Sequence, residues 1–217
     1  MKKAILFGAS GFIGSHLLNN LLANPAYDRV TIVVRKPVTV KHPKLVTLIG
    51  DYHSLPSLKD QLVADDVFIT LGTTQKKTPD AKEYYQVDHD YPVLATRLTR
   101  DNGATSVFMV TAIGANPNSK VTYIKTKGEA ERDVIALGME HVHIFRPSMI
   151  LGKRKEKRPM ERVLIGLWRV INPLLIGGLN RYKGMDARNI AKAMNNAAGK
   201  EAGRLKIYQW KEMRELL

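Results

Sequence analysis

The stretch Lys3-Ala-Ile-Leu-Phe-Gly-Ala-Ser-Gly-Phe-Ile-Gly-Ser15 decides the fold of this chain. Residues 4–7 are a short apolar run typical of a buried strand, and a helical pattern of apolar residues follows the glycines. Gly8 permits a tight turn, Gly11 lets the backbone approach a pyrophosphate, and Gly14 lets the helix pack on the strand. The first N–H groups of that helix would bind phosphate oxygens. The stretch therefore predicts a dinucleotide phosphate-binding loop, with an ordinary tight turn as the alternative.

Apolar or β-branched runs alternate with helical patterns along the whole chain. Strands are expected at residues 4–7, 30–34, 45–49, 67–70, 107–110, 142–145 and 205–208. Helices are expected at 12–23, 57–62, from 88 or 90 to 102, 121–137, 186–198 and 211–217. This alternation predicts one α/β domain over residues 1–217, with a doubly wound, mainly parallel sheet of the Rossmann type. Ligands should then bind beyond the carboxyl ends of the strands.

The composition is that of a basic chain of 217 residues without cysteine. The absence of cysteine excludes disulfides, thiolate catalysis and thiolate metal sites. The first expected strand begins so close to Met1 that we expect no secretory signal. The apolar stretch 163–179 is too short and too interrupted for a transmembrane helix. We therefore expect a cytoplasmic protein.

The net charge of +14 favours anionic ligands. Much of the excess lies in the run Lys153-Arg-Lys-Glu-Lys-Arg158, which we interpret as a solvated surface loop. No nucleic-acid motif or aromatic stacking platform accompanies the run, so we expect no nucleic-acid partner. The apolar stripe within residues 160–171 is typical of a core-facing helix. It equally fits a pocket cover, a homodimer surface or, without further support, a membrane contact.

Two cations after the second expected strand indicate which dinucleotide binds. Arg35 and Lys36 stand where an NAD-preferring site usually carries an acidic residue that binds the ribose hydroxyls. A planar, permanently charged guanidinium is suited instead to a 2′-phosphate. We therefore predict that NADP(H) is preferred over NAD(H), with two surface cations at a strand end as the alternative.

Further cofactor contacts are expected where other strands end. Asp51 follows the third strand and either accepts a hydrogen bond from the adenine amino group or caps a turn. Gly72 follows the fourth strand and would let the backbone pass close to the dinucleotide, although a structural turn explains it equally well. The predicted cofactor contacts from the strand ends and the glycine loop are Gly8, Ser10, Gly11, Phe12, Ile13, Gly14, Arg35, Lys36, Asp51, Leu71, Gly72 and Thr73.

A tyrosine and a lysine four residues apart open the helix after the fifth strand. Tyr123 and Lys127 would share one helix face, so the ammonium could lower the pKa of the phenol and also hold the nicotinamide ribose. A phenol activated in this way protonates a carbonyl oxygen, or deprotonates an alcohol in the reverse direction. The spacing is weak evidence by itself, and its weight comes from its place after Thr111, which ends the fifth strand.

With these motifs, the chain resembles an atypical short-chain dehydrogenase/reductase of the Tat-interacting-protein-like branch. The resemblance covers nearly the whole chain and rests on segments 8–14, 71–74, 87–91, 123–131, 145–148 and 186–191. It implies a Rossmann fold, an NADP(H) cofactor and a Tyr/Lys pair at Tyr123 and Lys127. It also implies that the segment with Arg146, Pro147 and Ser148 contacts the nicotinamide end.

One departure from the family concerns the residue that binds the substrate carbonyl. The family usually has a serine near Thr111 or Ala112, and here only Thr111 carries a hydroxyl. Thr111 can donate the same hydrogen bond, so we predict it as the third catalytic residue. If Ala112 is the true equivalent, the carbonyl loses a donor and turnover is in doubt.

These observations leave three functional hypotheses. The first is an NADP(H)-dependent oxidoreductase that acts on a small carbonyl or alcohol, with small substrate-side elements at about residues 153–183. The second is an NADPH-binding regulatory protein with little turnover. The third, a sugar-nucleotide epimerase or dehydratase, is disfavoured because such sites need a larger C-terminal subdomain. His141 and His143 share a strand face without further ligand spacing, so we expect no metal.

Overall fold

The computed structural model describes residues 1–152, 175, 177–200 and 203–217. Within them the chain forms a seven-stranded sheet in the order β3-β2-β1-β4-β5-β6-β9, and every neighbouring pair is parallel. The strands are β1 (Lys2–Phe7), β2 (Tyr27–Val34), β3 (Leu45–Ile49), β4 (Asp66–Ile69), β5 (Ser106–Val110), β6 (His141–Phe145) and β9 (Leu205–Tyr208). This confirms the predicted doubly wound α/β fold in a single domain.

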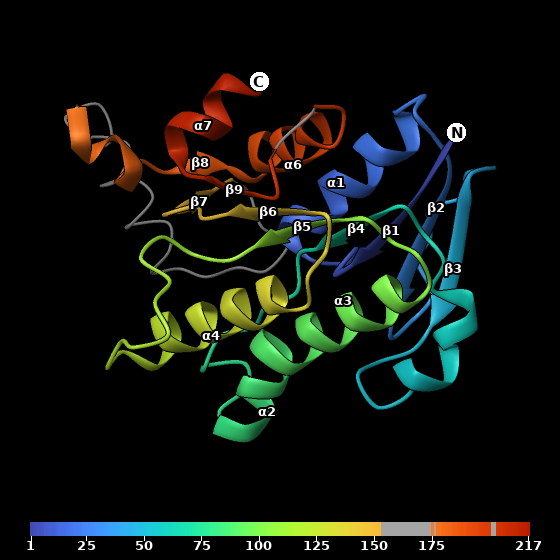
Figure 1. Cartoon of the computed structure of the whole chain (residues 1–217), viewed down its shortest axis with the longest axis horizontal. Coiled ribbons are helices and arrows are strands. Elements are labelled where there is room, and N and C mark those ends of the chain that lie inside the picture. The colour runs from blue at the N-terminus through green and yellow to red at the C-terminus, as the bar shows by residue number, and fades with distance from the viewer. Residues whose placement is uncertain (153–174, 176, 201–202) are drawn as a thin grey trace.

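Helices cover both faces of the sheet (Figure 1). One face carries α1 (Phe12–Ala23), α6 (Ala187–Ala197) and α7 (Trp210–Glu215), and the other carries α2 (Ala81–Tyr85), α3 (Tyr91–Asp101) and α4 (Thr122–Ala136). Each layer buries its own apolar cluster, with Leu17 and Ile190 on the first side and Ala95 and Val134 on the second. The strands read as continuous apolar runs because both of their faces are covered.

The topology places a binding crevice at the ends of two strands that are neighbours only in space. The chain winds from β1 outward to β3 and then returns to the opposite side of β1 as β4. The loops after β1 and β4 therefore separate, one toward each face of the sheet. A doubly wound sheet binds its ligand in the crevice that such a switch point opens.

The segment before α3 differs most from the sequence prediction. We expected a helix to begin at residue 88 or 90, but the chain is helical from Ala81, where the Asp80 side chain accepts the N–H of Glu83. A π-helical turn, Gln86–Asp90, then joins α2 to α3. Asp88 and Asp90 are residue types that favour a helix start, which made the boundary look later than it is. This turn buries Asp88.

Two smaller differences lie elsewhere. The expected helix at 57–62 is a 3₁₀ helix, Leu55–Gln61. The strands β7 (Ile150–Leu151) and β8 (Met185–Asp186) pair in parallel as a separate small sheet, and each is too short for periodicity to predict. A further 3₁₀ helix spans Gly177–Tyr182. The basic run 153–158 and the apolar stripe 160–171 lie outside the described residues, as does much of the predicted substrate side at about 153–183.

Candidate active site

The glycine loop has the geometry that its spacing predicts. Gly8 has a φ of +92°, which side chains rarely tolerate, and its carbonyl accepts the N–H of Gly11 at 2.9 Å. A Cβ on Gly14 would overlap the Gly8 carbonyl oxygen, so α1 packs on the turn only because residue 14 has no side chain. A Cβ on Gly11 would stand 3.1 Å from the same oxygen. The start of α1 therefore lies at the crevice, and a helix N-terminus is a favourable place for an anion.

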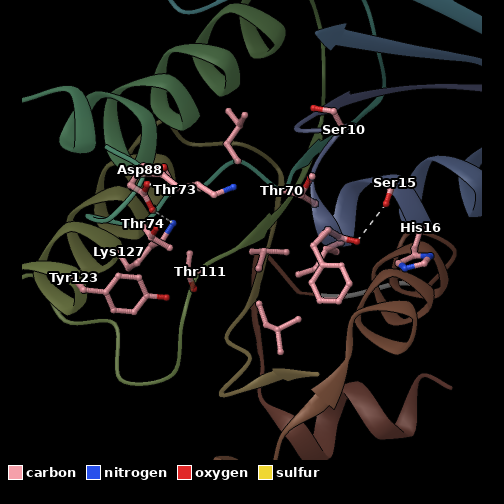
Figure 2. Close-up of a pocket in the computed structure, with 18 residues that line it drawn as sticks. Ser10, Ser15, His16, Thr70, Thr73, Thr74, Asp88, Thr111, Tyr123 and Lys127 are labelled. Atoms are coloured by element: carbon pink, nitrogen blue, oxygen red, sulfur yellow. Dashed lines mark hydrogen bonds and ion pairs between the residues drawn. The ribbon is translucent and has the colours of Figure 1, made fainter. Parts of the chain in front are cut away.

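A cavity of about 580 Å³ lies between this loop and the ends of β4 and β5. Its size is within the range of small-molecule and cofactor sites. The predicted site residues that line it are Ser10, Gly11, Phe12, Ile13, Leu71, Gly72, Thr73, Thr111, Tyr123 and Lys127. Figure 2 shows Ser10, Ser15 and His16 on one side of it and Tyr123, Lys127 and Asp88 on the other. The glycine loop and the Tyr/Lys pair thus share one cavity.

Tyr123 and Lys127 lie in the first turns of α4, as predicted. Gly128 fixes this helix, because a Cβ there would overlap the backbone at Asn116 and Pro117. In Figure 2 the Tyr123 hydroxyl points into the cavity toward Thr111. The helix therefore brings both side chains to the carboxyl end of β5.

Lys127 is held by a carboxylate that the sequence prediction did not assign. Its Nζ lies 2.6 Å from Oδ1 of Asp88, and the two side chains are 5% and 0% exposed. The other oxygen of Asp88 accepts the N–H of Thr73 at 2.8 Å. A buried ammonium is costly unless it is paired, so the contact with Asp88 offsets the cost of burying Lys127.

The pKa of the Tyr123 phenol is raised rather than lowered, which corrects the prediction. The removal of water by the surrounding protein is the largest cause, although 43% of the residue surface remains exposed. Lys127 lowers the pKa of the phenol as expected, but Asp88 raises it again. The helical spacing suggested the lysine, whereas segment 87–91 entered only as part of the family resemblance, with no role assigned to Asp88.

Thr111 also departs from its predicted role. Its hydroxyl donates to Oε1 of Glu131 at 2.5 Å, and the same carboxylate accepts from Nε of Arg146 at 2.9 Å. Because a hydroxyl has a single proton, this bond leaves Thr111 only lone pairs to present to the cavity. The predicted donation from Thr111 to a substrate carbonyl would have to compete with this bond, and it stays a prediction. Ala112 is buried and offers no replacement.

Four other predicted site residues have structural partners or positions outside the cavity lining. The side chain of Arg146 is engaged by Glu131, and Pro147 accepts the N–H of Ile113 at 2.9 Å through its carbonyl. Neither of them nor Ser148 lines the cavity. Asp51 caps its own turn, because its Oδ1 accepts from the N–H and the hydroxyl of Ser54. These bonds lower the pKa of the Asp51 carboxyl.

The two cations predicted to select NADP(H) lie at the end of β2. Arg35 and Lys36 are both exposed and stand outside the cavity lining. The pKa of the Tyr91 phenol is raised to about 12 by burial and by Asp51, and the Arg35 charge acts in the opposite direction. The Arg35 guanidinium therefore lies near α3 and the Asp51 turn. The place is the one expected for an adenosine group, and the selectivity itself stays a prediction.

Sequence reasoning missed eight residues of the cavity lining. They are Ser15, His16, Thr70, Thr74, Lys77, Asp88, Val110 and Ile150. Ser15 and His16 follow the glycine loop in the second turn of α1, so helical spacing alone could have found them. Asp88 could not be found in this way, because it lies 39 positions before Lys127 on another helical segment.

Within the described residues, no three His, Asp or Glu side chains gather closely enough to hold a metal ion, and no helix is long and apolar enough to cross a membrane.

Solved structures with a similar fold bind nucleotide cofactors and sugar nucleotides. MoeE5 in complex with UDP-glucose and NAD superposes with a TM-score of 0.70 at 20% identity, over 95% of this chain and 76% of that one. A UDP-N-acetylglucosamine 4-epimerase from Methanobrevibacter ruminantium gives 0.71 at 19% identity, over 96% and 76%. At this identity the likeness shows the fold alone.

Curated relatives are closer in sequence. The mitochondrial protein fmp52 of Aspergillus niger is 33% identical over 92% of this chain and 88% of its own length. The fmp52 protein of Aspergillus fumigatus is 35% identical over 91% and 87%. Because relatives at this identity are named as mitochondrial, the predicted cytoplasmic location is contradicted. That prediction rested on the absence of a secretory pattern and of a transmembrane helix, and neither absence carries information about organelles.

A family model described as NAD(P)H-binding matches residues 8–164. The match begins at the first glycine of the loop and includes β4, β5 and the Tyr123–Lys127 helix. It covers the cavity in which the glycine loop faces Tyr123 and Lys127. The chain therefore belongs to the NAD(P)H-binding family.

Proposed function

We propose that this protein is an NADP(H)-dependent oxidoreductase that acts on a small carbonyl or alcohol, within the Tat-interacting-protein-like branch of the short-chain dehydrogenases/reductases. The observation that carries the proposal is the shared cavity, in which the Tyr123 hydroxyl and Lys127 face the phosphate loop. We further propose that residues 1–217 form one domain in which the elements at about 153–183 complete the substrate side.

The cavity residues fit a dinucleotide. The Gly8 carbonyl would overlap any side chain at residue 14, so the loop lies tight against α1 and offers backbone N–H groups to a pyrophosphate. Arg35 and Lys36 would pair with a 2′-phosphate, and Lys127 retains two ammonium protons beside Asp88 for a ribose hydroxyl. When bound, the nicotinamide supplies the hydride.

The proton chemistry falls to Tyr123 in this proposal. Its hydroxyl would donate to the carbonyl oxygen of the substrate as that oxygen gains negative charge. The phenol keeps its proton at neutral pH, as a donor must, while its raised pKa makes it a weaker acid than a free phenol. Thr111 would contribute only as an acceptor, toward a hydroxyl or amide N–H of a bound molecule.

One observation favours the second hypothesis, an NADPH-binding regulatory protein. The Thr111 hydroxyl donates its proton to Glu131. Of the two predicted catalytic hydroxyls, Tyr123 and Thr111, only that of Tyr123 therefore offers a proton to a carbonyl. A site with one donor binds a carbonyl less firmly than a site with two. Tight NADPH binding without turnover would support this hypothesis.

The experiment that decides between them measures NADPH binding by calorimetry and then screens carbonyl compounds and quinones for NADPH oxidation. Turnover that is lost in Tyr123→Phe supports the oxidoreductase. Turnover that is equal in Tyr123→Phe and the wild type contradicts the assignment of the site. A chain that binds no dinucleotide at all contradicts both hypotheses.

A further inference from the structure

We propose that His89 is a pH-dependent clamp between two elements that line the cavity. When doubly protonated, its ring bonds Asp90 of the π-helical turn and Asp133 of α4 at the same time, and the loss of one proton releases the turn from the helix. The inference goes beyond the proposed function and does not depend on it, because it concerns how the two elements are held together.

Both ring nitrogens of His89 face carboxylates. Nδ1 lies 2.8 Å from Oδ1 of Asp90, its neighbour in the turn, and Nε2 lies 2.9 Å from Oδ2 of Asp133 on α4. A neutral imidazole has one N–H donor and one lone pair, whereas the doubly protonated ring has two donors. A neutral ring would place its lone pair against a carboxylate oxygen at one of the two contacts. The doubly protonated ring satisfies both.

Arg132 keeps the Asp133 carboxylate in its charged form. The Arg132 Nε lies 2.7 Å from Oδ1, and its Nη2 lies 3.0 Å from Oδ2, the oxygen that also contacts His89. The bond from Arg132 is the largest cause of the lowered pKa of the Asp133 carboxyl, and the bond from His89 lowers it further. This carboxylate therefore acts as an acceptor at neutral pH, and the proton in its contact with His89 comes from the ring.

The groups around the imidazole act on its charge in opposite directions. The side chain is 11% exposed, and burial disfavours a charged ring. Tyr85 of α2 stacks on it with the ring centroids 4.5 Å apart, and an aromatic face attracts a cation. Burial and Glu129 of α4 raise the pKa of the Tyr85 phenol to about 12, so this stacked ring stays neutral into the alkaline range. Two carboxylates and one aromatic face thus oppose the effect of burial.

The two contacts of the ring differ in what they join. The Asp90 contact lies within the turn, whereas the Asp133 contact crosses to α4. Arg132 already shares the charge of Asp133, while His89 is the one ion-pair partner of Asp90 among the described residues. The last ring proton therefore stays on Nδ1 beside Asp90, and it is the link to α4 that breaks.

This link lies behind the cavity. The π-helical turn contributes Asp88 to the lining, and α4 contributes Tyr123 and Lys127, whereas His89 is outside the lining. A released turn can move relative to α4, so pH acts on the edge of the cavity through a residue that no bound molecule touches.

The first measurement reads the protons of the ring by NMR, in full-length protein with ¹⁵N-labelled histidine. His89→Gln assigns the signal. Between about pH 5.5 and about pH 9.5 we expect the ring to pass from two protonated nitrogens to one, with the remaining proton on Nδ1. A ring that carries one proton throughout this range, or two throughout, overturns the inference.

The second measurement asks whether the proton holds the turn. Amide hydrogen exchange, corrected for the intrinsic effect of pH, reports the opening of residues 86–90. In the wild type their protection should fall at least about threefold when the ring loses its second proton.

Two variants that do not titrate separate the clamp from a general effect of pH. The amide nitrogen of His89→Gln reaches the place of Nε2, so this variant should keep the protection at both pH values. His89→Asn reaches only the place of Nδ1, so it should lack the protection at both. His53→Gln changes an exposed histidine and should follow the wild type. Protection that falls with pH in His89→Gln as it does in the wild type, or that persists in His89→Asn, overturns the inference.

Discussion

At the scale of single residues, Tyr123 is the side chain on which the proposed chemistry depends. Its hydroxyl faces the cavity, while its ring packs at the start of α4. Tyr123→Phe keeps the ring and removes the proton, so turnover should fall roughly 10²–10⁴-fold. The Kd for NADPH should change by less than about twofold. Tyr85→Phe, at a partly exposed tyrosine of α2 outside the cavity lining, is the control for steady-state kinetics and calorimetry. Equal rates in Tyr123→Phe and the wild type would contradict the role.

Arg35 carries the prediction of cofactor preference. NADPH should bind at least about tenfold more tightly than NADH, a ratio that needs about 1.4 kcal/mol. One charge-assisted contact to the 2′-phosphate supplies that much. Arg35→Asp should abolish the preference in parallel titrations of both cofactors. Arg29→Asp changes an exposed arginine at the opposite end of β2 and should preserve it. Equal affinities in the wild type would contradict the prediction.

At the scale of elements, two glycines in the turn from β1 to α1 are expected to affect different properties: Gly11 cofactor binding and Gly14 the stability of the fold. Gly11→Val should abolish dinucleotide binding in a chain that stays folded, because the new side chain would fill the space that a pyrophosphate needs. Its Cβ would stand 3.1 Å from the Gly8 carbonyl, a distance that a small shift relieves. Calorimetry with NADPH and circular dichroism test the two halves of this prediction. Binding at wild-type strength would show that the phosphate loop is misassigned.

Gly14→Ala should do the opposite in the same turn. Its Cβ would overlap the Gly8 carbonyl, so α1 must move off the strand, and we expect Tm to fall by about 5 °C or more. Gly178→Ala is the control, since a Cβ there meets nothing within 4 Å. A Gly14→Ala chain with the Tm of the wild type would contradict the packing argument.

Elements were predictable from the sequence where one local pattern decides them. The expected strand 45–49 and the expected helix 12–23 have the observed bounds, because apolar runs and the Asn24-Pro25 stop are local signals. The π-helical turn was not predictable, since it depends on how α2 and α3 join around Pro92. The Asp88–Lys127 and Thr111–Glu131 contacts join distant segments, so spacing within one element could not reveal them.

At the scale of the whole molecule, a stack of rings crosses the centre of the sheet. Phe68 of β4 stacks on Phe108 of β5, which stacks on His143 of β6 at a centroid distance of 4.3 Å. The His143 Nδ1 lies 2.9 Å from the Tyr208 hydroxyl of β9. The imidazole is therefore buried as part of the core, and it links four neighbouring strands.

The burial of His143 makes the stability of the fold depend on pH. Burial lowers the pKa of His143 to about 4, and the nearby His141 adds to the effect. The unfolded chain binds a proton near the ordinary value of about 6.5, so it gains protons before the folded chain does. The stabilisation from the neutral imidazole is thus complete above about pH 6.5 and is lost as the pH falls toward about 4.

His143→Asn does not titrate and keeps a polar atom near Tyr208, so its Tm should change less across this window than that of the wild type. His53→Gln, an exposed histidine, should follow the wild type in calorimetric scans. Parallel Tm curves for His143→Asn and the wild type between about pH 6.5 and pH 4 would contradict the argument.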